Sequence, residues 1–362
     1  MSNTDYDVII FGGGPAGAAA ALLLARRGLS VALLAKPSST PLIGETVPPT
    51  IVPALSELGL WPNFLAAGHA AAPGTVVIWG DDQPFENDFL FNPYGPGWHL
   101  DRPAFDAMLL EAAQAAGADI RPLTPLDCVA NPQGGWIVVT GTTNGIGTLT
   151  SRWVIDATGR IAWLAKRAGA TRHRLDRLVA LVRFAPDVSM SEPRTLIEAC
   201  RDGWWYAAAL PKNRIVAAWF TDADLLPRWR EARLQVWDRS FARANLLSTI
   251  VPPFSIASAV HIVAALSGRI LPCAGAGWFA IGDAAQTYDP LSGQGIAKAL
   301  ASASRAAEII LAEPRYGKKA IDDFAEATDS DYHDYLRGRF LHYRREGRWP
   351  RDPFWQRRLG AN

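Results

Sequence analysis

The sequence predicts an α/β fold, in which a Rossmann-like nucleotide-binding domain carries an inserted, mostly antiparallel sheet and ends in C-terminal helices. Three observations predict it. A glycine-rich turn follows the first apolar strand, two later strands end in turns of small residues, and a block of short strands lies between those later turns. With 362 residues the chain is long enough to bury a core in each part.

The first element is a strand at residues 7–11, which runs directly into a glycine-rich turn at 12–17 and a helix at 18–27. A second strand at 30–36 completes a βαβ unit. In this context the pattern G-x-G-x-x-G allows a tight turn, close helix packing, and close approach of the backbone to a pyrophosphate. The residues expected to bind a dinucleotide here are Gly12, Gly14, Pro15, Ala16 and Gly17.

The second strand departs from this pattern at its end. Ala35 stands where an acidic residue would bind the hydroxyls of the adenosine ribose. Two consequences are open: either Lys36 or backbone groups hold the ribose, or the site binds the cofactor somewhat more weakly.

A turn at residues 44–49 comes next, followed by a helix expected at 50–61. Gly44, Glu45 and Thr46 are placed to meet the cofactor, because doubly wound folds keep their ligands at the carboxyl ends of parallel strands. Glu45 has a second interpretation, as a helix-start carboxylate that the helix dipole favours.

A strand at 75–79 is expected to leave the nucleotide-binding domain, and residues 98–102 return to it. Pro103 then begins a helix that continues to Gly117. Arg102 lies just before this helix, so it is expected to meet a cofactor phosphate or ring edge; the alternative is an ordinary surface arginine.

A short parallel strand at 118–121 is followed by a hairpin with turns near 134–135 and 144–145, and Val129 on this hairpin is a further candidate cofactor contact. The strand at 151–156 then ends in Ala157, Thr158 and Gly159, whose small side chains would let a dinucleotide lie across the strand ends.

The third turn follows an apolar strand at 278–281 and opens a long Ala-rich helix. Asp283 can accept hydrogen bonds from a ribityl hydroxyl, and the helix start favours negative charge on a ring edge. The cofactor contacts expected here are Gly282, Asp283, Pro290, Gly293, Gln294, Gly295 and Ile296. Three such turns, spread along the chain, are what an extended FAD requires, and they predict a Rossmann-like domain of the glutathione-reductase type.

Between residues 179 and 264 the sequence predicts an antiparallel sheet with one inserted helix at 228–247. Five tryptophans fall in this block, at Trp204, Trp205, Trp219, Trp229 and Trp237, and they either fill a core or line an aromatic cavity. The tail at 348–358 is basic and aromatic, and it either packs on the body of the protein or docks a partner.

These elements divide the chain into three parts. The FAD-binding domain is discontinuous and takes residues 1–80, 98–175 and 266–315; the substrate-binding sheet takes 81–97 and 176–265; the C-terminal helix and tail take 316–362.

Composition excludes several classes of function. A net charge of +1 does not favour nucleic acid or an anionic membrane as a partner. The three cysteines have no redox or metal spacing, the histidines form no ligand cluster, and no apolar run is long enough for a membrane span. We therefore expect a metal-free cytoplasmic protein, whose oligomeric state the sequence does not determine.

Together, the three turns resemble those of the group A flavoprotein monooxygenases and flavin-dependent halogenases. Residues 44–46, 98–102, 203–206, 289–292 and 354–355 look most like the LodB/GoxB-type flavoproteins that mature quinone-cofactor oxidases. The resemblance implies that FAD, reduced by NAD(P)H or another external donor, reacts with O2 to a C4a-hydroperoxide that hydroxylates an aromatic ring. It implies as substrate a tryptophan of a partner protein, the precursor of a quinone-cofactor oxidase.

Glu45 and Asp289 are the candidate catalytic residues, although Asp289 with Pro290 could instead only shape the turn. One alternative is an aromatic hydroxylase of a free or carrier-bound small molecule, and another is a non-catalytic flavin-binding maturation partner. A halogenase is disfavoured, because the resemblance would require a lysine after the 44–49 turn and the sequence has none between Lys36 and Lys166.

Overall fold

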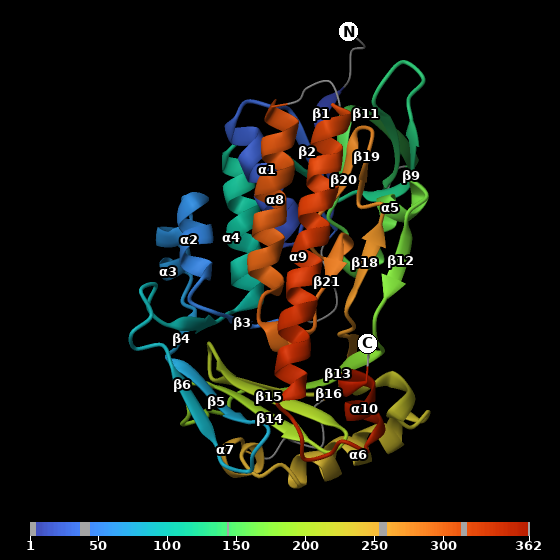
Figure 1. Ribbon diagram of the computed structural model, residues 1–362. Helices are drawn as coiled ribbons and strands as arrows, with labels where there is room; N and C mark the ends of the chain where they lie inside the picture. Colours follow the sequence, from blue (N-terminus) through green and yellow to red (C-terminus); the bar gives the residue numbers. More distant parts are fainter. Residues whose placement is uncertain (1–4, 37–43, 143–144, 253–258, 313–316, 361–362) are drawn as a thin grey trace.

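A mostly parallel sheet forms the centre of the nucleotide-binding domain (Figure 1). The computed structural model describes residues 5–36, 44–142, 145–252, 259–312 and 317–360. The sheet has the order β19-β20-β11-β1-β2-β8, with its five strands from β20 to β8 parallel. The strands are β1 (Tyr6–Phe11), β2 (Val31–Leu34), β8 (Asp119–Arg121), β11 (Gly145–Asp156), β19 (Ala274–Gly275) and β20 (Trp278–Ala280). This confirms the predicted α/β class.

Three helices lie side by side along one face of this sheet (Figure 1): α1 (Pro15–Arg26), α4 (Arg102–Ala115) and α8 (Gly295–Ala312). Helix α1 packs between the other two, and its alanines at positions 18–21 are fully buried. Small side chains there allow the close helix packing that the glycine-rich turn requires. The long helix α9 (Lys318–Arg344) runs beside α8 (Figure 1).

Smaller elements complete the domain. The β9 (Thr124–Ala130) and β10 (Trp136–Thr142) strands extend β11 into a meander. Two three-stranded sheets flank the centre. One has β12 (Thr171–Arg174), β18 (Gly268–Leu271) and β21 (Gln286–Thr287), and the other has β3 (Thr46–Val47), β7 (Gly97–His99) and β4 (Ala70–Ala72). The short helix α5 (Trp163–Arg167) follows β11.

The helix expected at 50–61 is two helices, α2 (Ile51–Glu57) and α3 (Trp61–Ala66). Gly59 between them has φ +65°, which a continuous helix does not allow, and a proline opens α3. The prediction of a single helix was therefore wrong.

The second sheet has seven strands in the order β17-β13-β16-β15-β14-β5-β6. They are β5 (Gly74–Ile78), β6 (Phe85–Asp88), β13 (Leu178–Ala185), β14 (Thr195–Cys200), β15 (Gly203–Leu210), β16 (Arg214–Asp222) and β17 (His261–Ala264). All neighbouring strands are antiparallel except β14 and β5. Strand β5 already belongs to this sheet, so the excursion from the nucleotide-binding domain begins before residue 80.

Helices cover one face of this sheet, and the C-terminal tail covers the other. One apolar cluster combines Trp205, Trp219 and Trp237 with α6 (Arg230–Ala242) and α7 (Leu247–Ile250). A second combines Trp204 with Trp355 and its neighbours in α10 (Pro353–Leu359). These tryptophans are buried in core contacts, which favours the core interpretation, whereas Trp229 is exposed. The helix predicted at 228–247 ends at residue 242 instead, and α7 begins separately.

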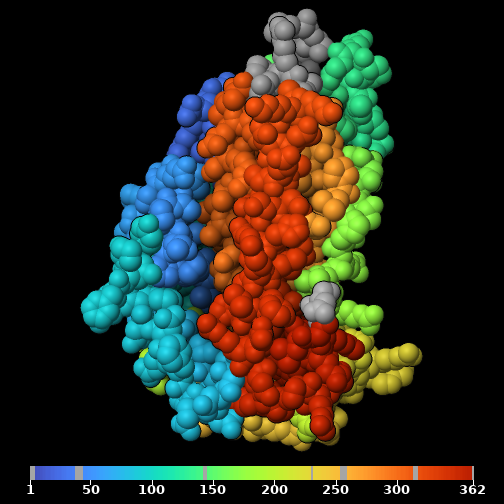
Figure 2. Space-filling view, viewed as in Figure 1, coloured from blue at the N-terminus to red at the C-terminus, as the bar shows by residue number. Residues whose placement is uncertain are grey.

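The tail packs on the body of the protein. Phe354 and Trp355 are fully buried, and Arg358 forms a buried ion pair with Asp222 of β16 at 2.8 Å. Figure 2 shows this C-terminal segment in red, continuous with α9 across the lower part of the surface. Among the described helices, none is long and apolar enough to cross a membrane.

Candidate functional site

The three predicted turns lie next to one another because the strands that deliver them, β1, β11 and β20, are adjacent and parallel. A Cβ atom on Gly12 would lie 2.4 Å from the carbonyl oxygen of Ala157, and one on Gly282 would lie 2.8 Å from the Cβ of Ala16. The first turn therefore touches both of the others. Residues separated by more than a hundred positions in the sequence form one continuous edge.

This edge leaves open space where a phosphate cofactor would lie. A Cβ atom on Gly14, which caps α1, would meet nothing within 4 Å, and the same holds for Gly159, and for Gly293 and Gly295 at the start of α8. Helix N-termini with free backbone N–H groups favour negative charge. The two helix starts thus fit a pyrophosphate and an electron-rich ring edge, respectively.

Asp283 forms ion pairs with two cations from distant segments. Its Oδ1 lies 2.8 Å from Lys298 Nζ, and its Oδ2 lies 3.4 Å from Arg160 Nε. Burial acts to raise the pKa of Asp283, but Lys298 and Arg160 lower it below its ordinary value. The Asp283 side chain is 34% exposed, so part of it stays accessible to a ligand.

A third cation, Arg172, lies behind the same turn. Its Nη2 donates to the carbonyl oxygens of Asp283 and Ala284, while Nε and Nη1 are buried without a hydrogen-bond partner among the described residues. Three cations, Arg160, Arg172 and Lys298, thus lie close to two carboxylates, those of Asp283 and Asp156. An anionic dinucleotide such as FAD fits this excess of positive charge, because it would supply the missing negative groups.

Glu45 is buried where the nucleotide-binding domain meets the second sheet. The residue is 4% exposed, and its Oε1 has no hydrogen-bond partner among the described residues. Burial raises the pKa of Glu45, although Arg102 and Arg214 act in the opposite direction. A carboxyl group of this kind can hold or accept a proton nearer neutral pH than an ordinary glutamate.

The neighbours of Glu45 connect the two domains. The Thr46 hydroxyl lies 2.6 Å from the Tyr206 hydroxyl of β15. Arg102 begins α4; its Nη1 donates to the carbonyl oxygen of Gly44, and its side chain also pairs with Asp106 at 3.2 Å. Arg102 therefore fixes the 44–46 turn.

The carboxylate of Asp289 is engaged in local structure. Its Oδ1 accepts from the backbone N–H of Leu291 at 3.0 Å, and its Oδ2 accepts from the Tyr343 hydroxyl at 2.7 Å and from Arg339 at 3.4 Å. The residue is also almost fully buried. Of the two roles considered for Asp289, these contacts favour the shaping of the turn that begins α8.

His99, which is buried at this junction, is a weak candidate for a base. Nε2 of His99 lies 2.9 Å from the Thr195 hydroxyl, and burial lowers the pKa of His99 to about 4. Among the described residues, no group of three or more His, Cys, Asp or Glu side chains could hold a metal ion.

Three other residues predicted to contact the cofactor lie outside the cluster around Asp283 or stabilise their own turn. Thr158 accepts from the backbone N–H of Trp163 and donates to Asp156, so it stabilises its own turn. Lys36 is exposed at the end of β2, and Val129 is exposed on β9, on the meander rather than at a strand-end turn. Arg160, Arg172 and Lys298 were not among the predicted site residues, and Tyr206 was noted only as part of the 203–206 segment. Of the three cations, only Arg160 carried a local signal, because it directly follows the 157–159 turn.

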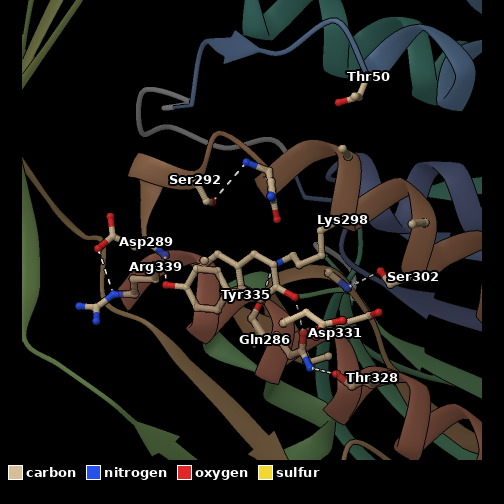
Figure 3. Close-up of a pocket in the computed structure, with 18 of the residues that line it drawn as sticks. Thr50, Gln286, Asp289, Ser292, Lys298, Ser302, Thr328, Asp331, Tyr335 and Arg339 are labelled. Atoms are coloured by element: carbon tan, nitrogen blue, oxygen red, sulfur yellow. Dashed lines mark hydrogen bonds and ion pairs between the residues drawn. The ribbon is translucent and has the colours of Figure 1, made fainter. Parts of the chain in front are cut away.

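A groove of about 560 Å³ opens between α8 and α9 (Figure 3). Figure 3 shows Thr50 across the opening from Ser292, with Lys298 and Tyr335 further along the groove. Leu291, Ser292 and Gln294 also line it. The groove therefore reaches the start of α8, where the cofactor ring is expected.

Comparison with known proteins identifies the family. Residues 5–326 match the FAD binding domain family. The chain belongs to this family. It is 30% identical, over 98% of its own length and 96% of the relative's, to the putative FAD-dependent oxidoreductase LodB of Marinomonas mediterranea. This protein is thus an FAD-dependent oxidoreductase of the halogenase-like monooxygenase superfamily.

Two solved structures share the fold of this FAD-binding protein. The myxobacterial chondrochloren halogenase CndH has a TM-score of 0.87 and 24% identity, covering 99% of this chain and 86% of the other. The peptidyl tryptophan dihydroxylase QhpG, essential for tryptophylquinone cofactor biogenesis, has a TM-score of 0.83 and 25% identity, covering 98% of this chain and 78% of the other.

We expect Asp283→Ala to weaken FAD binding by ~1.5–3 kcal/mol, as for a lost hydrogen bond to a charged group. The accessible part of the carboxylate is the part that would contact the ribityl chain. The measurement is an FAD titration of the folded apoprotein, with circular dichroism to correct for destabilisation, since Lys298 loses its partner. Unchanged FAD affinity would contradict the assignment.

Proposed function

We propose that this protein is an FAD-dependent monooxygenase that hydroxylates a tryptophan side chain of a partner protein during biogenesis of a quinone cofactor. The observation that carries the proposal is the likeness to the peptidyl tryptophan dihydroxylase QhpG, which extends over 98% of the chain at 25% identity. The likeness to LodB over almost the full length agrees with it.

The residues of the three turns would hold the cofactor. The 12–17 turn and the start of α1 would bind the pyrophosphate, Asp283 would bind the ribityl chain, and the start of α8 would meet the flavin ring edge. Arg102 would act through the 44–46 turn that it fixes. Bound FAD, once reduced by NAD(P)H or another donor, would activate O2 for transfer of oxygen to the ring.

Glu45 is the residue we propose for the proton transfer. An aromatic carbon that gains oxygen must lose a proton, and a base close to it accelerates that loss. Glu45 has a raised pKa and a buried position at the junction with the sheet, and its Oε1 meets no hydrogen-bond partner in the part of the chain that the structure describes. Tyr206, hydrogen bonded to Thr46, would line the same space from the side of the sheet.

Halogenation is the second candidate, because the fold is shared with the halogenase CndH. Lys298, beside the third turn, is ion paired with Asp283, and Lys212 on the second sheet's side is ion paired with Asp101 at 2.7 Å. The chain has no lysine between Lys36 and Lys166. The lysine expected of a halogenase therefore has no evident counterpart, which favours hydroxylation.

The test uses the FAD-loaded protein with a chemical or enzymatic reductant, ¹⁸O2, and bromide in the buffer. Candidate substrates are the Trp-containing precursor of a quinone-cofactor oxidase, a Trp-containing peptide, free tryptophan and a carrier-bound aromatic. We expect ¹⁸O in a tryptophan of the precursor, located by mass spectrometry. Bromine in the product would make the protein a halogenase, and labelling of the free or carrier-bound compound alone would make it a small-molecule hydroxylase.

A further inference from the structure

The chain between β5 and β7 exposes an unusual set of large apolar side chains. Phe85 is 67% exposed, Leu90 80% and Phe91 94%, and Tyr94 follows close by. This segment projects from the side of the molecule (cyan in Figures 1 and 2). When several large apolar side chains are exposed together in one segment, they often mark an interaction surface, whereas a single exposed one does not.

The segment begins at an open sheet edge. Strand β6 is the last strand of the seven-stranded sheet, and it pairs only with β5 among the described strands. An edge strand presents unpaired backbone groups to which an extended chain can add as a further strand.

The strand register connects this edge to the candidate site. Phe85 pairs with Val77 of β5, Val77 with Ile197 of β14, and Ile197 with Tyr206 of β15. Register partners point to the same face of a sheet, so these four side chains form one apolar row. With strands ~4.8 Å apart, the row spans roughly 14 Å. Its three inner members are partly buried, and Ile197 and Tyr206 pack against the apolar cluster that the C-terminal tail covers. The row is therefore open at Phe85 and becomes partly covered toward Tyr206.

The row ends beside the proposed catalytic carboxyl group. Tyr206 is hydrogen bonded to Thr46, the residue after Glu45. The exposed segment reaches the same place from its other end, because it leads into β7, which pairs with β3 at Thr46. Both the apolar row and the chain that follows the exposed segment therefore lead to Thr46, the residue next to Glu45.

The charge around this edge is negative. Residues 37–101 contain no lysine or arginine. Arg194 reaches Glu86, Asp88 and Glu192, and Arg348 reaches Asp82 and Glu346. With Asp81, six carboxylates lie near this edge, against the guanidinium groups of Arg194, Arg348 and the exposed Arg345, whose backbone meets Gly80. The excess of negative charge attracts a basic partner and repels an anionic membrane.

We propose that the β6 edge and the apolar row form the docking track for the protein substrate. A basic, apolar segment of that substrate adds to β6 in extended conformation and places its aromatic side chain along the row toward Tyr206 and Glu45. This inference rests on the proposed function and adds to it where the substrate protein binds and with what kind of segment.

The experiment measures binding separately from turnover. The probes are two short fluorescent peptides with a central Trp between Leu and Val residues, one flanked by lysines and one by glutamates. Fluorescence anisotropy with the FAD-loaded protein gives the affinity, with Phe85→Ala/Phe91→Ala as the test variant. Ile146→Ala is the matched control, because Ile146 is 77% exposed on the distant β11. We expect the lysine peptide to bind more tightly, and the test variant to lose about tenfold or more in affinity, as for truncated aromatic anchors.

Equal affinity of the test variant, an equal loss with Ile146→Ala, or preference for the glutamate peptide would overturn the docking track. So would a wild-type dimer that the test variant dissociates, since a second copy would then occupy the surface. A peptide that binds the track but is never oxygenated would contradict the proposed function and would still support the docking track. Hydroxylation of a precursor by the test variant with unchanged KM would contradict the docking track and would still support the proposed function.

Discussion

We expect Gly14→Val to abolish FAD binding while the apoprotein stays folded. Gly14 is the cap of α1 with φ −73° and ψ −178°, an extended conformation that valine adopts readily. The added side chain meets no protein atom within 4 Å of its Cβ position, so it enters the space assigned to the pyrophosphate. The measurements are flavin content after incubation with FAD, fluorescence titration, and the melting temperature of the apoprotein.

Gly347→Val is the matched control for this result. Gly347 is exposed near the C-terminus, and a Cβ atom there also meets nothing within 4 Å. We expect this variant to bind FAD like the wild type. A soluble Gly14→Val protein that is fully loaded with FAD would contradict the position of the pyrophosphate.

We expect Glu45→Gln to lower kcat by about 10²–10⁴-fold, the range for loss of a positioned acid or base. Because burial raises the pKa of Glu45, its carboxyl group becomes protonated at a higher pH than an ordinary glutamate. A protonated carboxyl group cannot accept a proton, so wild-type activity falls as the pH drops through this pKa. The pH–rate profile of Glu45→Gln lacks that acidic limb, while its FAD affinity stays close to that of the wild type.

The melting temperature distinguishes loss of the catalytic base from unfolding of the Glu45→Gln variant. A carboxyl group whose pKa is raised in the folded state contributes stability below its unfolded pKa, and this contribution is lost as the pH rises through the folded pKa. Replacing Glu45 by the neutral Gln therefore removes no stabilising negative charge at neutral pH. We expect the melting temperature of Glu45→Gln to equal or exceed that of the wild type. Retention of the acidic limb in the variant would exclude Glu45 as the base.

Asp289→Asn provides the contrast, since Asp289 accepts from Leu291, Tyr343 and Arg339. Loss of its charge weakens three hydrogen bonds that hold the start of α8, so we expect a lower melting temperature. If this variant, rather than Glu45→Gln, removes the acidic limb at full FAD occupancy, the roles of the two carboxylates are reversed.

Contiguous stretches of the sequence were sufficient for the architecture. A strand, a glycine turn and a helix that follow one another within about 20 residues encode their own geometry through side-chain periodicity and glycine conformations. For that reason the 12–17 turn, the strands that end just before Ala157 and Gly282, and the Ala-rich helix after the third turn could be predicted correctly. The single helix predicted at 50–61 failed because the turn at Gly59 interrupts an otherwise helical pattern.

Interactions between distant segments were decided only by the tertiary structure. The cations around Asp283 come from Arg160, Arg172 and Lys298, on three separate elements, and no sequence spacing announces that they meet. The same is true of Glu45 beside Tyr206, and of the row from Phe85 to Tyr206, which exists only through strand register. The sequence by itself determined which local structures form, because neighbouring residues fix the backbone conformation. The packing of remote segments determined which side chains are buried and which contact one another. It therefore also decided that Asp289 is engaged in local hydrogen bonds, whereas Glu45 is the carboxyl group proposed for proton transfer.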